Sequence, residues 1–388
     1  MKKICIISEF YPYEGEPLFP FVQQLAYSLS NENVDCTVVA PQSITKNIIR
    51  HMAPKPFEIT DISPDDKKIR VLRPYILTFS NTKNKVLQWI ADKFMERAIR
   101  RGVEAAGNID AVYCYFWHVG LMTSIALKKL DVPIYVQASE CELTIHSYMK
   151  TQQNLSRVKH VICASGKNRN ESIAEGLVDK ENTTVIVNGY RTDEFYSIPK
   201  ATARAKLGIS PEKFVVVFVG GFIERKGIRQ LSNVLDRFDD VYSIFVGQGE
   251  EPPQCKNILF SGKVPHNQIV NYLNCGDIFV LPTRAEGCCN AIIEALACGL
   301  PVISSNKAFN DEILSDACSI RIDEQNEDEL YKSISELKDN TVRRNEMAHA
   351  ALEKAKQLTI EHRAKAIKNV VFGDKAQFDS QYEKAKES

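Results

Sequence analysis

Short apolar runs recur along the whole chain, and segments with helical periodicity separate them. In the first half of the sequence the runs occupy residues 4–7, 34–40, 111–116, 134–138, 158–164 and 185–187. A second series occupies residues 214–219, 242–246, 258–260, 278–281, 301–303 and 319–322. Continuous apolar runs are typical of strands covered on both faces, and their alternation with helices favours parallel, doubly wound sheets. We therefore expect an α/β protein with two such sheets.

The length also predicts two domains, because 388 residues exceed what one hydrophobic core usually supports. The stretch 190–207 is polar and contains Pro199, which indicates a junction. We predict a first Rossmann-like domain over residues 1–195 and a second over residues 200–356.

The charge balance gives no global attraction to nucleic acid or to anionic membranes, because 49 basic residues offset 49 acidic ones. Any such binding would have to be local. The 11 cysteines form no Cys-x-x-Cys pair and lie mostly in apolar runs, which indicates a reducing compartment rather than disulfides or a zinc site. The sequence shows neither a signal peptide nor an apolar span of about 18 residues. We expect a cytoplasmic protein, or one peripheral to the inner face of a membrane.

The segment 286–305 carries the clearest chemical pattern. It links the apolar runs 278–281 and 301–303 through a helix that we expect to begin at Gly287 and to end at Gly299. The chain therefore predicts a strand, a loop, a helix and a second strand in succession.

Two carboxylates flank the start of this helix, with seven residues between Glu286 and Glu294. Eight positions are a little over two helical turns, so both can approach one ligand at the helix N-terminus. The free N–H groups around residues 288–291 suit a phosphate. The pattern predicts a diphosphate site with two hydroxyl-binding carboxylates, as a sugar nucleotide requires. The same spacing also fits a surface helix with ordinary acidic residues.

The same stretch resembles the donor-site signature of retaining GT-B glycosyltransferases, in particular family 4, the glycosyl transferases group 1. The matching residues are Glu286, Glu294, Ala297, Cys298, Gly299, Pro301 and Val302. The resemblance implies a GT-B fold, in which two Rossmann-like domains face a cleft and a C-terminal helix, about 357–388, returns to the first domain. We also considered a strand at 370–372. The implied reaction is the transfer of a hexosyl-type sugar from a nucleoside diphosphate to a glycan or lipid-linked acceptor with retention, as in cell-surface polysaccharide biosynthesis.

By resemblance, Glu294 binds the ribose hydroxyls and Glu286 binds a hydroxyl of the donor sugar. The remaining donor-binding residues are predicted to be Gly221, Lys226, Gly247, Gly262, Val264, Gly287, Cys288, Cys289, Asn290 and Ala291. The base is expected to meet main-chain groups, which leave no side-chain signature. We favour a UDP-sugar over a GDP-sugar as co-substrate, and expect no further cofactor.

Positive charge for the leaving diphosphate is expected from the segment 218–227. Lys226 and Gly227 fit the family pattern, whereas the usual arginine position is Gly221. Arg225 can supply the second cation, although a solvated residue at a helix start fits equally. We predict Lys226, Arg225 and Glu286 as the catalytic residues, with no metal ion required.

Acceptor-side residues are predicted at the ends of strands in the first half. Gly15 is the single glycine in a loop where relatives often hold a pair. Gln137 occupies the position of the family histidine, and Glu140 follows it. His118 and His146 are the nearest histidines that could replace it in function, although a structural role is open for each of these residues.

Residues 81–101 are predicted to form an amphipathic helix with Val86, Ile90 and Phe94 on one face. The segment carries six basic and two acidic residues. It could lie on an anionic membrane beside a lipid-linked acceptor, or its apolar face could pack on the sheet.

Two other functions fit parts of the sequence. A dinucleotide-dependent oxidoreductase would need Gly-x-Gly-x-x-Gly after a strand, but the first strand continues into Ser8 and Glu9. A catalytically inactive relative acting as a sugar-nucleotide-binding or partner subunit is the other alternative, because Gln137 and Gly221 depart from the family pattern.

Overall fold

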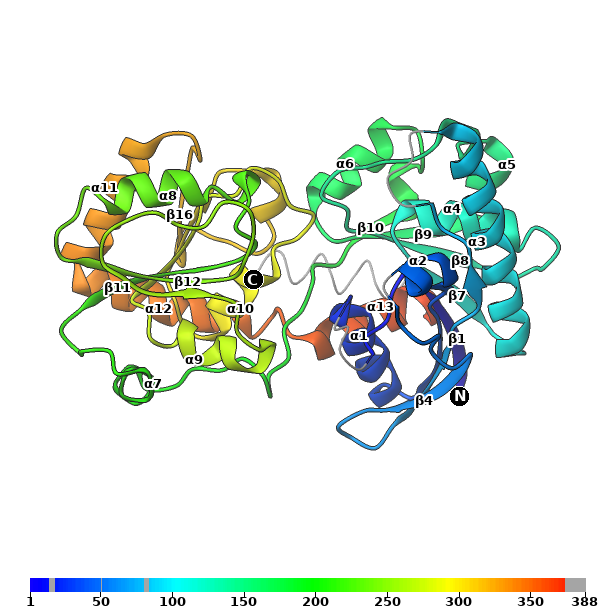
Figure 1. The fold of residues 1–388 in the computed structure, drawn as a ribbon, viewed down its shortest axis with the longest axis horizontal. Coiled ribbons are helices and arrows are strands. Elements are labelled where there is room, and N and C mark those ends of the chain that lie inside the picture. Colours follow the sequence, from blue (N-terminus) through cyan, green and yellow to red (C-terminus); the bar gives the residue numbers. More distant parts are fainter. Residues whose placement is uncertain (14–17, 50, 80–83, 374–388) are drawn as a thin grey trace. The chain divides into compact units, whose positions relative to one another are not determined.

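The computed structural model describes residues 1–13, 18–49, 51–79 and 84–373. The chain divides into two compact units (Figure 1). Unit 1 comprises Met1–Ala164, Asn168–Ile186 and the chain from Arg363, and unit 2 comprises Ser165–Lys167 and Val187–His362. The division falls before the expected junction at 195–200, and the chain returns to unit 1 at Arg363 rather than at residue 357. The predicted acceptor residue Gly15 and the end of the predicted C-terminal helix lie outside the described residues.

Unit 1 is built on an eight-stranded sheet in the order β10-β9-β8-β7-β1-β2-β5-β4. Its strands are β1 (Lys2–Ile7), β2 (Val34–Val39), β4 (Glu58–Ile62), β5 (Lys68–Leu72), β7 (Ala111–Tyr115), β8 (Ile134–Ala138), β9 (Val158–Cys163) and β10 (Thr183–Val185). All pair in parallel except β4 with β5. The expectation of a purely parallel sheet was wrong at this edge, because β4 and β5 form an antiparallel pair whose outer strand is largely exposed and therefore lacks a continuous apolar run.

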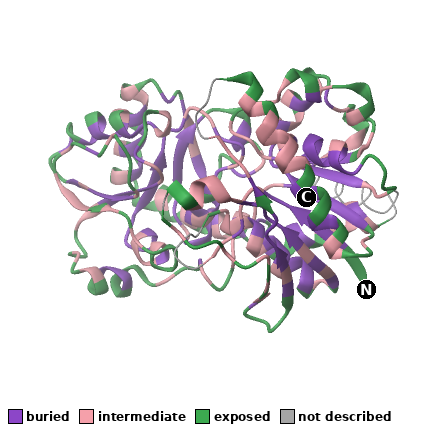
Figure 2. Ribbon diagram, turned by 45° about the vertical axis from the view of Figure 1, so that its right-hand side comes forward, coloured by how far each residue is buried: buried purple, intermediate pink, exposed green. Residues whose placement is uncertain are grey.

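Successive side chains of β1 enter different cores, as expected of a sheet covered on both faces. Ile4 and Ile6 pack with α1 (Pro20–Asn31) and α13 (Ile360–Phe372). Cys5 and Ile7 pack with α3 (Lys85–Ala106) and α4 (Trp117–Ala126). Figure 2 shows the strands as buried and the outward surfaces of the helices as exposed. Unit 1 is therefore doubly wound.

Helix α13 is fixed to the sheet of unit 1 by a hydrogen bond in which the Tyr135 hydroxyl donates to the Val371 carbonyl at 3.0 Å. The strand considered at 370–372 is wrong, because these residues end α13. The smaller elements of unit 1 complete the description. They are β3 (Gln42–Ser43), α2 (Ile44–Ile49), β6 (Tyr75–Ile76), α5 (Gln152–Leu155) and α6 (Gly166–Ala174).

Helix α3 packs on the sheet through its second half only. Its buried residues are Ala98, Ile99, Gly102 and Val103. The predicted face is less buried: Val86 is 65% exposed, and its neighbour Trp89 is 51% exposed. The interpretation that the Val86 face packs on the sheet is therefore wrong for the first turns. No helix among the described residues is long and apolar enough to cross a bilayer.

Unit 2 contains a six-stranded parallel sheet in the order β13-β12-β11-β14-β15-β16. Its strands are β11 (Phe214–Val219), β12 (Val241–Val246), β13 (Ile258–Gly262), β14 (Ile278–Leu281), β15 (Val302–Ser305) and β16 (Ser319–Ile322). Figure 1 shows α8 (Ile228–Leu235) and α11 (Glu327–Asp339) on one face, and α9 (Ile269–Leu273), α10 (Asn290–Ala297) and α12 (Thr341–Ala355) on the other. The two sheets and their helical layers form a GT-B fold, as predicted.

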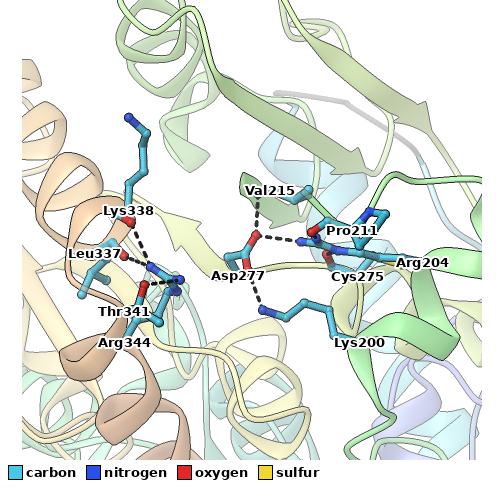
Figure 3. A network of polar contacts seen from close by, with 10 residues as sticks. All are labelled: Lys200, Arg204, Pro211, Val215, Cys275, Asp277, Leu337, Lys338, Thr341 and Arg344. Carbon is cyan, nitrogen blue, oxygen red and sulfur yellow. Dashed lines mark hydrogen bonds and ion pairs between the residues drawn. The ribbon is translucent and has the colours of Figure 1, made fainter. Parts of the chain in front are cut away.

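A buried ionic network ties α7 (Lys200–Leu207) to the start of β14 (Figure 3). Asp277 accepts from Arg204 at 2.7 Å, from Lys200 at 2.5 Å and from the Val215 amide at 2.7 Å. Arg204 is only 3% exposed and also donates to the carbonyls of Pro211 and Cys275. The charge is therefore paired and its hydrogen bonds are made, which is what burial requires.

Candidate functional site

The candidate site lies where the order of strands in unit 2 reverses. β11 is followed outward by β12 and β13, and the chain then returns to β14 on the opposite side of β11. The loops that leave β11 and β14, residues 220–227 and 282–289, begin at the same edge of the sheet. Ligands of open α/β sheets bind at such a position.

Close backbone contacts hold these two loops together. Gly227 has a φ of 72°, and a Cβ atom there would lie 2.3 Å from the Pro282 carbonyl oxygen. Only glycine combines this backbone conformation with this approach. The Arg284 amide donates to the Arg225 carbonyl at 2.9 Å, and the Thr283 hydroxyl donates to the same oxygen at 3.3 Å. The loops therefore form one rigid surface.

Glu286 is the centre of this surface and is only 8% exposed. Its Oε1 accepts from Lys226 Nζ at 2.6 Å and from the Thr283 hydroxyl at 2.8 Å. Arg225 Nη1 lies 3.0 Å from the same oxygen and also donates to the Ala285 carbonyl. Among the described residues none donates a hydrogen bond to Oε2. One oxygen thus fixes the carboxylate, and the other can accept from a ligand.

Lys226 stays charged within the cluster. Burial by itself would lower its pKa, but electrostatic interactions with the neighbouring Cys289 and Glu286 raise the pKa above the usual value. The carboxylate of Glu286 is the effective partner, because burial raises the pKa of the Cys289 thiol to about 12 and keeps it neutral. A fixed cation therefore lies at the carboxyl ends of β11 and β14.

Helix α10 begins at Asn290 and not at Gly287 as expected. Cys289 is extended, with φ −89° and ψ 99°, so the residues from Gly287 to Cys289 belong to the preceding loop. Cys289 makes no side-chain capping hydrogen bond. The first N–H groups of a helix lack intrahelical acceptors, so they can bind an anion. The Asn290 side chain is occupied, because its Oδ1 accepts from Asn188 at 2.8 Å.

Glu294 lies on α10 beside His266, a residue that the sequence interpretation missed. His266 Nε2 lies 3.7 Å from Glu294 Oε1, and Nδ1 lies 3.5 Å from Glu194 Oε2. The two carboxylates raise the pKa of His266 to about 10, while burial raises the pKa of Glu294. His266 follows Val264 by two positions, so the predicted base-binding loop carried the only sequence signal for it.

The glycines predicted for nucleotide binding lie at the ends of neighbouring strands. The Gly247 amide, after β12, donates to the carbonyl of Gly262 at the end of β13 at 2.9 Å. A Cβ on Gly247 would lie 1.8 Å from the Gly220 carbonyl oxygen, so the two chains approach too closely for a side chain. Gly221 differs, because its nearest neighbour would be Ile223 at 3.9 Å. Val264 and Ala291 are half-buried against the core of unit 2.

The predicted acceptor residues Gln137, Glu140 and His118 of unit 1 differ in burial and in hydrogen-bond partners. Gln137 is fully buried and accepts from the Tyr113 hydroxyl, so it has no solvent access. Glu140 accepts from the Trp117 amide at 2.5 Å, at the N-terminus of α4. His118 lines a cavity, with Nε2 4.0 Å from Asp92 Oδ1, and burial lowers its pKa. Of these three, His118 is the one that lines this cavity.

Comparisons with known proteins agree with this geometry. Residues 199–358 match the family model "Glycosyl transferases group 1". The chain is 24% identical over 328 residues to the putative teichuronic acid biosynthesis glycosyltransferase TuaC of Bacillus subtilis. The matched region covers 78% of this chain and 81% of that protein. It spans only about half the length of several other curated relatives. The matched residues include the segment 286–305, which resembles the donor-site signature of this family.

Solved structures resemble the whole chain. Sucrose-phosphate synthase from Thermosynechococcus elongatus superposes with a TM-score of 0.73 at 18% identity, covering 99% of this chain and 100% of that one. HepE of Anabaena, solved in complex with UDP, gives a TM-score of 0.69 at 17% identity, covering 96% and 99%. At these identities the likeness shows the fold.

Proposed function

We propose that this chain, a glycosyltransferase of group 1 with a GT-B fold, transfers a sugar from a nucleoside diphosphate donor to a glycan or lipid-linked acceptor with retention of configuration. The observation that carries the proposal is the Glu286 carboxylate, fixed by Lys226 and Arg225 where the strand order reverses, next to the start of α10. Cations, a helix N-terminus and a carboxylate with one available oxygen are what a sugar diphosphate needs.

In the proposed mechanism, the donor diphosphate lies on the amides at the start of α10 and beside Lys226 and Arg225. As the glycosidic bond breaks, negative charge grows on the leaving diphosphate, and the two cations stabilise it. Glu286 Oε2 accepts a hydrogen bond from a hydroxyl of the donor sugar, and Glu294 accepts hydrogen bonds from the ribose hydroxyls. The acceptor oxygen bonds to the anomeric carbon on the face from which the diphosphate departs, and an oxygen of the leaving diphosphate takes the acceptor proton. The mechanism uses no enzymic nucleophile and requires no metal ion.

The donor is proposed to be a UDP-sugar. HepE has been solved with UDP and with UDP-glucose, and one relative from Escherichia coli is a UDP-Gal-dependent galactosyltransferase acting on a diphosphoundecaprenol acceptor. A different relative, from Corynebacterium glutamicum, depends on GDP-mannose, so both nucleotides have to be tested. The names of TuaC and the Escherichia coli enzyme support a role in cell-surface polysaccharide biosynthesis. We propose that the chain acts at the cytoplasmic face of the membrane.

The test is turnover of a panel of UDP- and GDP-sugars by the purified chain, followed by NMR of the product. We expect release of UDP from a UDP-sugar and a product with the anomeric configuration of the donor. A product of inverted configuration would contradict the mechanism. Tight binding of a sugar nucleotide without any turnover would instead identify the inactive partner subunit, which the departures at Gln137 and Gly221 left open.

A further inference from the structure

Unit 1 contains a cavity of about 310 Å³ at the carboxyl ends of β1 and β2. Phe10, Ile76, Ala91 and Met95 form part of an apolar wall, whereas Arg73 and Lys46 bring positive charge to the lining. His118 belongs to the same lining. Every residue that lines the cavity belongs to unit 1, whereas Glu286 belongs to unit 2.

Arg73 is buried without the partners that a buried charge needs. The residue is 2% exposed, and its Nη1 has no hydrogen-bond partner. Nη2 reaches the Pro12 carbonyl only at 3.4 Å, and the guanidinium lies 4.9 Å from the centre of the Tyr13 ring. It forms no ion pair with any described residue. An arginine stays protonated even where burial lowers its pKa, so the fold holds a buried cation that Asp61 stabilises without direct contact.

Asp61 is the acidic residue that acts electrostatically on Arg73, and other groups already donate hydrogen bonds to its carboxylate. Asp61 Oδ2 accepts from the hydroxyl of Tyr11 at 2.6 Å, from Gln23 at 2.8 Å and from the hydroxyl of Tyr27 at 2.8 Å. These hydrogen bonds occupy the carboxylate, which acts on Arg73 electrostatically but forms no ion pair with it. In the part of the chain that the structure describes, Arg73 therefore lacks a contacting counter-ion.

A second cation faces the same space. Lys46, on α2, has its ammonium 5.6 Å from the centre of the Phe10 ring, and it too lacks an ion pair among the described residues. The acidic residues of the lining are Glu9 and Asp92. Asp92 accepts from the Tyr148 hydroxyl, both Asp92 and Glu9 act electrostatically on His118, and neither carboxylate forms an ion pair with Arg73 or Lys46. Arg73 and Lys46 therefore remain for a ligand.

We propose that this cavity binds the acceptor of the sugar transfer through an oxyanion, either a phosphate or a carboxylate, that pairs with Arg73 and Lys46, while the apolar wall holds an uncharged part of the same molecule. The inference rests on the proposed function only where it identifies the ligand as the acceptor of the sugar transfer. The unpaired buried guanidinium and the apolar wall define the ligand class: an amphipathic anion. A planar guanidinium is suited to bind either group in a bidentate manner.

The experiment is calorimetric titration of the purified full chain with three probes that share one alkyl chain: octyl phosphate, octyl glucuronide and octyl glucoside. We expect one or both anionic probes to bind, and the neutral glucoside to bind much more weakly. The tighter of the two anions identifies the oxyanion as phosphate or carboxylate. Equal binding of all three probes, or binding of none, would overturn the proposal.

Variants localise the binding. Arg73→Gln should lower the affinity for the anionic probe by about tenfold or more, the scale of a lost charge-assisted hydrogen bond. Arg73→Lys should restore part of this affinity. Arg70→Gln is the matched control, because Arg70 lies on β5 and pairs with Glu58 on the surface. If Arg73→Gln does not fold, Lys46→Gln at its half-exposed position must show the loss. Unchanged affinity in the folded variants would refute the assignment.

UDP binding by the wild-type chain separates the two claims. If UDP binds and the affinity for the anionic probes is unchanged in the Arg73 and Lys46 variants, the inference about the cavity fails and the proposed donor site stands. If the probes behave as expected and no nucleoside diphosphate binds, the proposed function fails, and the cavity remains an oxyanion site of another purpose.

Discussion

Lys226 Nζ lies 2.6 Å from Glu286 Oε1, although the two residues are 60 positions apart in the chain. The contact exists because β11 and β14 are neighbours in the sheet, and the loop after each strand carries one partner. The ion pair is nearly buried, with side-chain exposures of 14% and 11%. Each residue therefore fixes the position of the other.

Loss of either partner should reduce activity strongly. Glu286→Gln removes the anion that orients Lys226, and Lys226→Ala removes positive charge from the leaving diphosphate. We expect kcat/KM to fall by about 10²–10³ in each variant, the scale found when one preorganised electrostatic group is removed. Arg229→Gln is the control, because Arg229 is exposed and pairs with Glu251 outside the cluster. Near-normal turnover in both cluster variants would refute the site.

The Asp277 network should matter for stability rather than for activity. Asp277→Asn leaves the Arg204 guanidinium buried without its counter-ion, which costs about 3–5 kcal/mol in the free energy of unfolding. Chemical denaturation of wild type and variant measures the difference. Asp239→Asn removes an exposed pair with Lys256 and should change little. Equal stability of the two variants would show that Arg204 finds another partner.

The fold was predictable because the central strands of both sheets are buried on two faces and so read as apolar runs. The edge pair β4 and β5 was missed because polar and charged residues interrupt both strands, so that neither contains a continuous apolar run. The start of α10 was misplaced by three residues, since Gly287 and the two cysteines after it give no local signal that distinguishes a loop from a helical turn.

The candidate site was predictable only in part. Glu286, Lys226 and Arg225 were chosen from motifs, and the structure brings all three together. His266 was missed because its partners, Glu194 and Glu294, are distant in sequence. Sequence position alone also does not reveal which side of a strand a residue occupies, so nothing indicated that Gln137 would be fully buried.

Stability should depend on pH through His266. Its contacts with Glu194 and Glu294 raise its pKa to about 10 in the folded chain, from 6.5 for a free side chain. The charged ring therefore contributes its full stabilisation below pH 6.5, and this contribution is lost as the pH rises towards 10. The difference in unfolding free energy between wild type and His266→Gln should shrink over that range. A difference independent of pH would contradict the ion-pair assignment.

Peripheral membrane contact is proposed for the first turns of α3. Val86 and Trp89 are exposed there beside Lys85 and Lys93, a combination suited to an anionic bilayer surface. The double variant Val86→Ser, Trp89→Ser should bind vesicles containing phosphatidylglycerol more weakly than wild type in a sedimentation assay. The control is Val342→Ser, an exposed apolar residue on α12. If all three proteins sediment alike, α3 is not the contact.

The central claim is that unit 2 binds the diphosphate of a sugar nucleotide between the start of α10 and Lys226. Calorimetric titration of wild type and Lys226→Ala with UDP, GDP and the two nucleosides tests it most directly. We predict that the preferred nucleoside diphosphate binds about tenfold or more weakly to the variant, whereas the nucleoside binds equally to both proteins. Equal affinity of wild type and variant for the diphosphate would contradict the account.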